Sequence, residues 1–447
     1  MKMKKFHWWF IPLGLVILLL VLIIALVIFM RSMLPWENLL AATSNVKLEL
    51  SAEQKEFIEG EPRDYSTLPD ALVMADGTAV TTPEQFKTRR AEILSLFEEH
   101  VYGTLPKDGF TTSFEVVEEG EALDGAAIRR QVKITVNTEK GASDALMLLY
   151  IPNTNIPSPV IVGLNSNGNH AAIADENVLP SYTFDTEDGT WEEKRGEKAY
   201  RWNIEDSIAR GYAVATIYSG DFAPDNGKTY TSQVVSLFDE EDFKAVGAWA
   251  FGLMRAVDYF EQDAAFDGHI AVVGHSRLGK AAVWAGANDT RIGMVISNDS
   301  GNSGASLSRE NRGETVYSIN LAFPHWFSSK YADYGKKEDT LPVDQNLLLA
   351  AIAPRLLYVA SADGDMWADP QGAWNGLMYA TNAFALHGFD VIPYSATQPE
   401  VNTPVWTESM GYHVRTGWHD MQADDWAFYL DYMDTYFLTR AIAETTN

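Results

Sequence analysis

The spacing of apolar residues divides the chain into three stretches. Residues 8–30 (WWFIPLGLVILLLVLIIALVIFM) are apolar without interruption and follow the basic start MKMKK. Residues 31–66 are polar and show no clear periodicity, which is typical of a linker or stalk. Apolar positions recur at helical or strand spacing from residue 67 to residue 447, so we expect one folded domain there.

The apolar stretch 8–30 has the length of a membrane anchor. As a helix it would extend about 34 Å, which is enough to span a hydrocarbon core of about 30 Å. Three lysines precede it, so the positive-inside rule predicts that residues 1–7 are cytoplasmic and that the folded domain is extracellular. The alternative is a signal peptide cleaved near Leu40-Ala41-Ala42, although the apolar core of a signal peptide is normally shorter. Both interpretations predict an exported domain.

The folded domain begins with one helix and several strands. Residues 83–102 place their apolar side chains close to a helical stripe, and Gly103 and Pro106 end the pattern. Residues 112–136 and 143–151 alternate or are rich in β-branched side chains, which predicts strands.

A second pattern, of short and nearly continuous apolar runs, begins after residue 158. The runs are PVIVGL, YAVATIY, HIAVVG, GMVIS and RLLYVAS, at residues 159–164, 212–218, 269–274, 293–297 and 355–361. Runs of this kind are typical of parallel strands that are buried on both faces. Helical stretches separate them, chiefly 242–262 and 278–287, and the last helix is expected at 424–441. This alternation predicts an α/β fold with a doubly wound, mostly parallel sheet between helices.

Composition narrows the function classes. Of the 447 residues, 46% are hydrophobic and 21% are charged, which excludes a disordered or fibrous protein. A formal net charge of -27 repels phosphate backbones, so we expect no nucleic-acid partner. The chain has no cysteine, which excludes disulfides, thiolate metal sites and a cysteine nucleophile.

Residues 269–287 (HIAVVGHSRLGKAAVWAGA) carry the strongest local signal. A buried strand leads into Gly274-His275-Ser276 and then directly into an alanine-rich helix, which is the context of a nucleophile elbow. The pattern is Gly-x-Ser-x-x-Gly, because Leu278 occupies the place of the usual second glycine. A serine before a helix is also a favoured N-cap. The apolar strand and Gly274 favour Ser276 as a nucleophile.

A serine nucleophile needs a histidine base and an orienting acid, which follow it in the order Ser, Asp or Glu, His in this fold. His387 ends a predicted helix, whereas His413 and His419 lie in GYHVRTGWHDM, which we expect to be the loop before the last helix. We predict His419 as the base because it directly precedes that helix. Asp299 and Asp365 follow successive strands after the elbow, and both remain candidates for the acid.

At these residues the sequence resembles the glucuronoyl esterases of carbohydrate esterase family 15. Those enzymes carry a Gly-Cys-Ser-Arg-x-Gly-Lys elbow, and residues 274–280 read GHSRLGK. Their Glu-Ser-Gly segment is similar to Asp299-Ser300-Gly301. Other segments that resemble bacterial members are 89–103, 163–170, 210–225, 313–316, 323–327 and 367–372. The resemblance extends over about residues 67–441.

The resemblance implies the α/β-hydrolase fold and a role for four further residues. Arg277 would place its guanidinium beside the oxyanion, as an added cation. Lys280 and Glu314 would bind sugar hydroxyls, and Trp367 would offer a flat face to a pyranose ring. The ordinary alternatives are a surface lysine, an acid at a helix start and a core aromatic residue.

Two departures from the family pattern concern the elbow and the acid. His275 replaces the cysteine of fungal members, which removes their disulfide. Asp299 replaces the usual glutamate, so its carboxylate reaches about one methylene less far. Asp365 resembles a second acid of some bacterial members, and we therefore expect Asp299 and Asp365 to share the orienting work.

The resemblance implies a serine esterase that hydrolyses esters of 4-O-methyl-glucuronic acid on xylan, with an alcohol such as those of lignin. It implies glucuronoxylan as the polysaccharide partner, and no metal or other cofactor. An acetylxylan esterase or another carbohydrate esterase with the same triad is the closer alternative. A non-catalytic polysaccharide-binding protein of the cell surface is the other, and it would be expected to have lost the triad.

Overall fold

The computed structural model describes residues 62–187, 189–240 and 242–439. The predicted anchor at 8–30, most of the predicted linker, and residues 440 and 441 of the predicted last helix lie outside the described residues. In the described part of the chain, no helix is both long enough and apolar enough to span a membrane.

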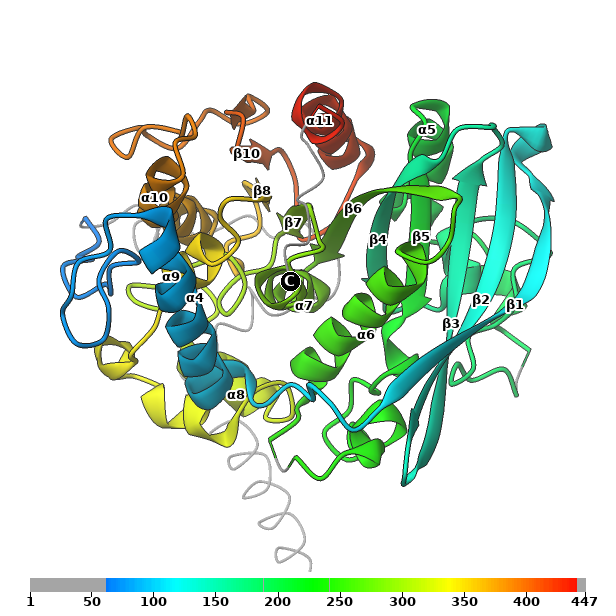
Figure 1. Cartoon of the computed structure of the whole chain (residues 1–447), viewed down its shortest axis with the longest axis horizontal. Coiled ribbons are helices and arrows are strands. Elements are labelled where there is room, and N and C mark those ends of the chain that lie inside the picture. The colour runs from blue at the N-terminus through cyan, green and yellow to red at the C-terminus, as the bar shows by residue number, and fades with distance from the viewer. Residues whose placement is uncertain (1–61, 188, 241, 440–447) are drawn as a thin grey trace, which may run out of the picture.

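Ten strands form one sheet in the order β1-β2-β3-β5-β4-β6-β7-β8-β10-β9 (Figure 1). Their bounds are β1 Thr111–Ala122, β2 Ala127–Thr138, β3 Gly141–Pro152, β4 Ser158–Asn165, β5 Ala213–Tyr218, β6 Phe266–His275, β7 Met294–Asn298, β8 Leu356–Ala362, β9 Val405–Trp406 and β10 Met410–Arg415. The pairs from β5 through β4, β6, β7 and β8 to β10 are parallel. The first strands and the β10–β9 pair are antiparallel, so the sheet is mixed with a parallel centre.

Helices alternate with the strands, and α4, α6, α7 and α11 correspond to helices that the sequence predicts. They are α4 Pro83–Phe97, α5 Ile204–Ala209, α6 Ala245–Phe260, α7 Arg277–Asn288, α8 Val316–Ala322, α9 Gln345–Ala350, α10 Pro370–Leu386 and α11 Ala423–Tyr432. The Thr82 side chain accepts the Gln85 N–H and so caps α4, whose first residue is Pro83. Both α4 and α11 continue into a π-helical turn, at Glu98–Tyr102 and Met433–Phe437.

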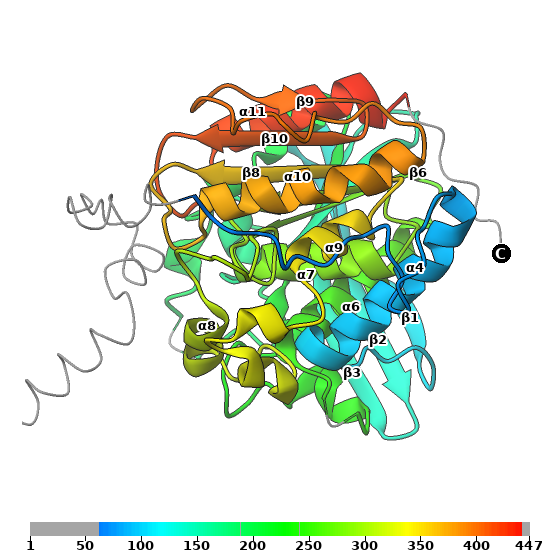
Figure 2. The ribbon, with the colours of Figure 1, turned by 90° about the vertical axis from the view of Figure 1, so that its left-hand side faces the viewer.

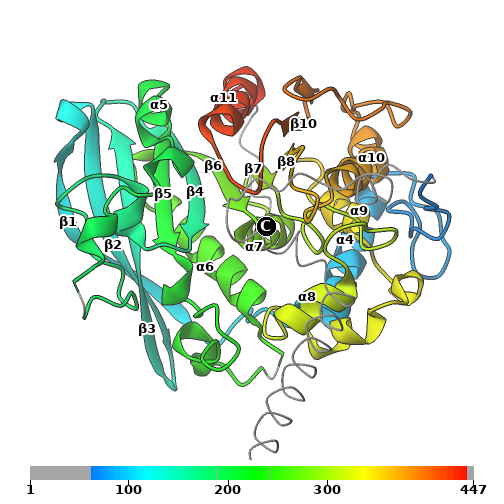
Figure 3. The ribbon, with the colours of Figure 1, turned by 180° about the vertical axis from the view of Figure 1, so that it is seen from behind.

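Helices cover both faces of the sheet (Figures 1 and 3). One face packs against α6 and α7, and α4, α9 and α10 lie on the same side (Figure 2). Alternate residues of the strands divide between the faces: Val160 and Val272 belong to this larger core, whereas Ile161 packs with α11 on the other face. Because helices cover both faces of the sheet, the side chains on both faces of the central strands are buried. This explains the continuous apolar runs in the sequence.

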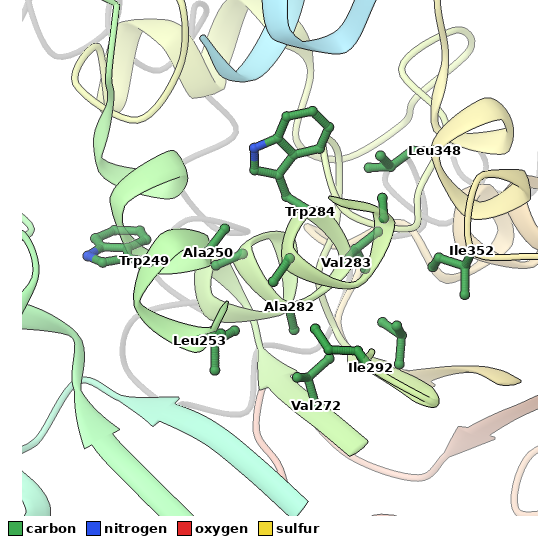
Figure 4. Packing of buried hydrophobic residues seen from close by; sticks show 14 of the residues in the cluster. Trp249, Ala250, Leu253, Val272, Ala282, Val283, Trp284, Ile292, Leu348 and Ile352 are labelled. Atoms are coloured by element: carbon green, nitrogen blue, oxygen red, sulfur yellow. The ribbon is translucent and has the colours of Figure 1, made fainter. Parts of the chain in front are cut away.

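The larger core is densest around α7 (Figure 4). Ala282 and Val283 lie between the sheet and the neighbouring helices, and Trp284 stacks on Tyr102 with ring centroids 4.5 Å apart. At Gly286 an added Cβ would lie 2.2 Å from Val295, so small residues let α7 approach β7 closely. The alanine-rich composition of this helix is thus a packing requirement that fixes its N-terminus against the sheet.

The sequence predicts the parallel strands and the longer helices α4, α6, α7 and α11, but not the short elements α5, α8, α9 and β9. Near the C-terminus its prediction is wrong. Residues 411–415, which we expected to be part of a loop, form strand β10 beside β8. The prediction is wrong there because β10 buries His413 and Arg415, both with 0% exposure, and polar side chains of this kind disguise a buried strand. The loop proper is limited to residues 416–422, and it carries His419.

Candidate active site

Strand β6 and helix α7 are joined by a single residue, Ser276. Its backbone has φ 59° and ψ -130°, a strained conformation for a residue with a side chain, and its N–H donates to Asn298 O at 2.9 Å. A Cβ on Gly274 would lie 2.1 Å from Leu278 O, so only glycine fits before the turn. At Gly279 an added Cβ would lie 2.9 Å from Gly274 O, which makes Gly279 the second small residue that the bend needs. The geometry is that of a nucleophile elbow.

The histidine that approaches Ser276 is His419. Its Nε2 lies 2.7 Å from Ser276 Oγ, and its Nδ1 lies 2.6 Å from Asp365 Oδ2. His419 and Asp365 are both buried. Ser276, His419 and Asp365 come from three loops at the carboxyl ends of β6, β10 and β8, where parallel strands bring sequence-distant residues together. The three residues form a continuous chain of possible proton contacts.

The second candidate acid, Asp299, lies beside this chain without a hydrogen bond to His419. Its Oδ2 is 3.4 Å from Arg415 Nη2, and its buried Oδ1 has no partner among the described residues. Burial, together with repulsion from Asp365, raises the pKa of Asp299 well above its usual range, and Arg415 opposes this only in part. Of the two aspartates, only Asp365 therefore contacts the imidazole.

One group of described residues has the composition of a metal site, and it is this same cluster. Single ligand atoms of Asp299, Asp365 and His419 all lie within 4.8 Å of one another. The His419 Nδ1 is engaged with Asp365 at 2.6 Å, and the guanidinium of Arg415 adjoins Asp299. The guanidinium of Arg415 therefore supplies a positive charge beside this cluster.

The loop that carries His419 is held by the buried Arg415. Its Nη2 donates to the carbonyls of Trp418 and Asp420, the residues on either side of His419. Its Nε donates to Asp425 Oδ2 at 2.7 Å, which ties the loop to the first turn of α11. His413, the other candidate base, lies on β10 with Nε2 2.8 Å from Asp425 Oδ1, away from Ser276. His387 ends α10, and its ring lies against Phe86.

A second imidazole packs on the first. The rings of His275 and His419 have centroids 4.6 Å apart, and His275 Nδ1 lies 2.6 Å from Asn298 Oδ1. Burial lowers the pKa of His275 well below its usual range, and the neighbouring His419 adds to the effect. His275 is therefore a neutral ring at neutral pH that restricts the movement of His419.

Arg277, the predicted oxyanion cation, lies at the edge of the site. Its guanidinium pairs with Asp225 and lies over the ring of Trp326, 5.0 Å from the centroid. Burial alone would raise the pKa of Asp225, but the contacts from His325, Arg277 and Trp326 lower it to about 2. Asp225 thus remains ionised and holds Arg277 beside Ser276.

The three predicted sugar-binding residues lie together, next to the first turn of α7. Lys280 Nζ donates to Glu314 Oε2 at 2.6 Å and to the carbonyls of Ser300 and Asn302. Trp367 Nε1 donates to Glu314 Oε1 at 3.1 Å. Burial lowers the pKa of Lys280, while Glu314 opposes this. The polar atoms of all three residues are engaged with the protein, and their exposures are 5% or less.

A cavity of about 460 Å³ opens beside Ser276. Its lining includes the elbow, His419 and Arg277, the end of β4 with the residues that follow it, and a segment before α5. The lining residues are Leu164, Asn165, Ser166, Asn167, Lys198, Arg201, Trp202, Val273, Gly274, His275, Ser276, Arg277, Leu278, His419 and Met421. Lys280, Glu314 and Trp367 do not belong to this lining.

Sequence reasoning missed the residues that support the site. Asp225, Asn298, Arg415 and Asp425 act through contacts that join distant segments, such as the pair of Arg277 and Asp225, 52 positions apart. One local signal was present, namely the two basic side chains His413 and Arg415 close together in the sequence, which need an acidic partner when they are buried. Asp425, in the first turn of the next helix, is that partner for both.

Comparison with known proteins gives the same family from sequence and from structure. The family model for fungal glucuronyl esterase matches residues 199–388. Carbohydrate esterase MZ0003, from an unknown prokaryotic organism, is 43% identical over 387 residues, which cover 82% of this chain and 89% of that protein. The 4-O-methyl-glucuronoyl methylesterase of Cerrena unicolor is 26% identical, over 72% of this chain and 64% of that protein.

Solved structures agree. A promiscuous CE15 esterase from a marine bacterial metagenome superposes with a TM-score of 0.76 at 40% identity, over 85% of this chain and 98% of that one. The glucuronoyl esterase from Solibacter usitatus gives a TM-score of 0.77 at 38% identity, over 84% of this chain and 99% of that one. Both likenesses extend over nearly the whole of the described domain. The chain therefore belongs to carbohydrate esterase family 15, the glucuronoyl esterases, and is a carboxylic ester hydrolase.

Proposed function

We propose that this enzyme hydrolyses esters of 4-O-methyl-glucuronic acid on glucuronoxylan, with Ser276 as nucleophile, His419 as base and Asp365 as the orienting acid. The observation that carries the proposal is the 2.7 Å contact between Ser276 Oγ and His419 Nε2 at a strained elbow. Family membership supports the uronic ester as the substrate class.

The reaction proceeds in two steps. With a proton on Nδ1 that is donated to Asp365, His419 presents Nε2 as acceptor for the Ser276 proton. The hydroxyl oxygen attacks the ester carbonyl, and the imidazolium returns the proton to the alcohol as it leaves. Water then attacks the acyl-enzyme by the same route, releases the uronic acid and restores the Ser276 hydroxyl.

The oxyanion of each tetrahedral intermediate lies near the start of α7. The first backbone N–H groups of a helix have no partner within it, so those of Arg277 and Leu278 are available as donors. The guanidinium of Arg277 adds a positive charge beside them, and Asp225 keeps it in place.

For the acid, we assign Asp365 the contact with the imidazole and Asp299 a subsidiary role. The 2.6 Å distance from His419 Nδ1 supports Asp365. The raised pKa of Asp299 supports a neutral carboxyl that leaves Asp365 as the charged partner. Asp299 then shares the site without competing for His419.

We propose that Lys280, Glu314 and Trp367 recognise the sugar. Lys280 is one turn after the nucleophile, and its N–H donates to Ser276 O at 3.2 Å, which supports a position next to the reacting ester. These three residues already form hydrogen bonds with one another, so a sugar hydroxyl must join or replace one of those bonds. A ligand without a suitable hydroxyl cannot do so, and the cluster therefore selects for sugars.

Assays on two substrates test the proposal. Benzyl or methyl esters of 4-O-methyl-glucuronate are compared with acetylated xylan, using parent enzyme and Ser276→Ala. We expect turnover of the uronic esters that depends on Ser276. Turnover of acetylated xylan alone would contradict the substrate assignment. A second activity on acetyl esters is also a candidate, because the relative at 40% identity is described as promiscuous.

We further propose that residues 8–30 anchor the enzyme in the cell membrane, with the esterase domain 67–447 outside the cell. The support is the uninterrupted apolar sequence and the basic start. The expected result is esterase activity in the membrane fraction that is released as soluble enzyme when residues 1–61 are deleted. Full-length activity in the culture medium would show a cleaved leader instead.

A further inference from the structure

The cavity beside Ser276 is lined by hydrogen-bond donors and lacks acidic side chains. Among its lining residues, Lys198, Arg201 and Arg277 are cationic, and no aspartate or glutamate belongs to the lining in the described part of the chain. The protein as a whole carries a formal charge of -27, so this composition contrasts with the average surface. A wall of donors recognises an acceptor-rich or anionic group.

Arg201 is a cation of this lining whose two terminal nitrogens are both unpaired among the described residues. Its Nε lies 2.6 Å from Asp420 Oδ1, and its terminal nitrogens donate to no other described residue. A guanidinium presents its terminal N–H groups as a planar fork that fits the two oxygens of a carboxylate. The ion pair with Asp420 lies at the Nε end of the guanidinium and leaves its terminal edge unpaired among the described residues.

Further donors adjoin it on the same wall. Among the described residues, the Lys198 ammonium pairs only with the exposed Glu197, at 2.8 Å. The side chains of Ser166 and Asn167 form no hydrogen bond with another described residue. Each cation has one acidic partner outside the cavity, so the net charge of the wall is small. What the wall provides is N–H and O–H donors that are not yet hydrogen-bonded.

Arg201 also lies on the side from which the alcohol must leave. The leaving oxygen takes its proton from His419 Nε2, so the alcohol has to lie within reach of that atom. Asp420, the partner of Arg201, is the residue that follows His419. Lys280, Glu314 and Trp367, assigned to the sugar, are not part of this lining. The wall with Arg201 and Lys198 therefore faces the alcohol portion of the ester.

We propose that Arg201 and Lys198 form a subsite for a carboxylate carried by the alcohol portion of the substrate, so that the enzyme prefers uronic esters of acidic alcohols. This inference rests on the proposed function, because it uses the same nucleophile and the same orientation of the ester. It adds no chemical step: the acidic alcohol leaves with the proton from His419 as any other alcohol does.

Two esters of 4-O-methyl-glucuronate that differ only in charge test the subsite. One has para-carboxybenzyl alcohol as its leaving group, and the other has the isosteric, neutral para-carbamoylbenzyl alcohol. At low ionic strength the kcat/KM of the parent should be about tenfold higher for the carboxylate ester than for the carbamoyl ester, mainly because KM is lower. A factor of this size is expected from one charge-assisted hydrogen bond. The ratio should fall as salt is added.

Variants separate binding from effects on the catalytic loop. Arg201→Gln should bring the ratio of the two esters close to one, and Lys198→Gln, which does not touch Asp420, should lower it by a smaller factor. Lys194→Gln is the control, because this exposed lysine lies outside the lining and should leave the ratio unchanged.

Three results would overturn the subsite. A ratio near one in the parent, with both esters hydrolysed, contradicts the subsite and leaves the proposed function intact. Equal loss on both esters in Arg201→Gln, with the ratio kept, would assign Arg201 to positioning the His419 loop through Asp420. Hydrolysis of neither ester would contradict the proposed function and the subsite together.

Discussion

In the cavity beside Ser276 several donors are unpaired among the described residues, and Arg201 has terminal N–H groups that no described residue accepts. Outside that cavity, Lys280, Glu314 and Trp367 form a buried cluster in which the polar atoms are bonded to the protein. The first turn of α7 contributes residues to both regions. Unpaired donors are suited to capturing a ligand, whereas a fully paired cluster fixes geometry until a ligand with matching groups arrives.

The comparison also separates the two acids. Asp365 has a direct contact with the imidazole of His419, while Asp299 lies against Arg415 with one oxygen unpaired among the described residues. Asp299 directly follows β7, whereas Asp365 is the third residue beyond the end of β8, so the two carboxyl groups start from different points at the same edge of the sheet. Substitutions in the triad, in the paired cluster and at a buried histidine should therefore have effects of decreasing size.

The largest loss is expected for Ser276→Ala. Removal of the nucleophile should lower kcat on uronic esters by on the order of 10³-fold or more, because the oxyanion donors alone sustain only residual catalysis. Steady-state kinetics on the benzyl ester measure this, with a thermal melt as control for folding. A variant that retains more than about a tenth of the parent kcat would exclude Ser276 as nucleophile.

The two acids should differ by a large factor. Asp365→Asn should lower kcat by on the order of 10³-fold, since the amide cannot stabilise the imidazolium that forms on His419. Asp299→Asn should lower it by about tenfold or less, because the raised pKa of Asp299 already favours its neutral form. The same kinetic assay on both variants decides the matter, and the reverse order would make Asp299 the triad acid.

The paired cluster should respond in stability as well as in binding. Lys280→Met leaves Glu314 as a buried charge with one neutral donor, and should destabilise the fold by about 3 kcal/mol. KM for uronic esters should rise in the same variant. Glu314→Gln combined with Lys280→Met should recover part of the stability, because no unpaired charge remains. Lower stability with an unchanged KM would show that the cluster has no role in sugar binding.

The smallest effect concerns the segment behind the cavity wall. His170 is buried between Phe184 and Trp191, and neither ring nitrogen has a described partner. Burial lowers its pKa from 6.5 to about 4. The unfolded chain therefore binds a proton in this window that the folded protein does not, so stability falls as pH drops from 6.5 to 4.

His170→Phe removes this proton linkage. The difference between its melting temperatures at pH 7 and pH 4.5 should be smaller by a few degrees than that of the parent. Asp225 provides a contrast, because its pKa of about 2 means that its contribution is lost only below pH 3.8. An equal difference in parent and variant would show that His170 takes up no additional proton on unfolding.

The sequence is sufficient for the sheet and the elbow because both depend on local patterns. Continuous apolar runs and an alanine-rich helix indicate β6 and α7 without further information. Ser276 and His419 follow from the order of a triad along the chain. The choice between Asp299 and Asp365 does not, because it depends on which carboxylate reaches the imidazole in three dimensions.

The features of the site that the sequence does not predict depend on polar contacts between distant segments. The exposed surface lysine that ordinary reasoning expects at position 280 is a buried cation, because Glu314 and two carbonyls converge on it from another segment. Likewise, nothing near Arg277 in the sequence indicates that Asp225 holds it. Pairings of this kind are determined by tertiary contacts and leave no periodic trace in the chain.

Labelling with a fluorophosphonate tests the central claim most directly, because the reagent reacts only with a serine whose hydroxyl is activated by its base. The parent should incorporate one label, mapped by mass spectrometry to Ser276, and lose esterase activity in proportion, while His419→Ala should react at least about a hundredfold more slowly. A label on another residue, or equal labelling rates in parent and His419→Ala, would contradict the account.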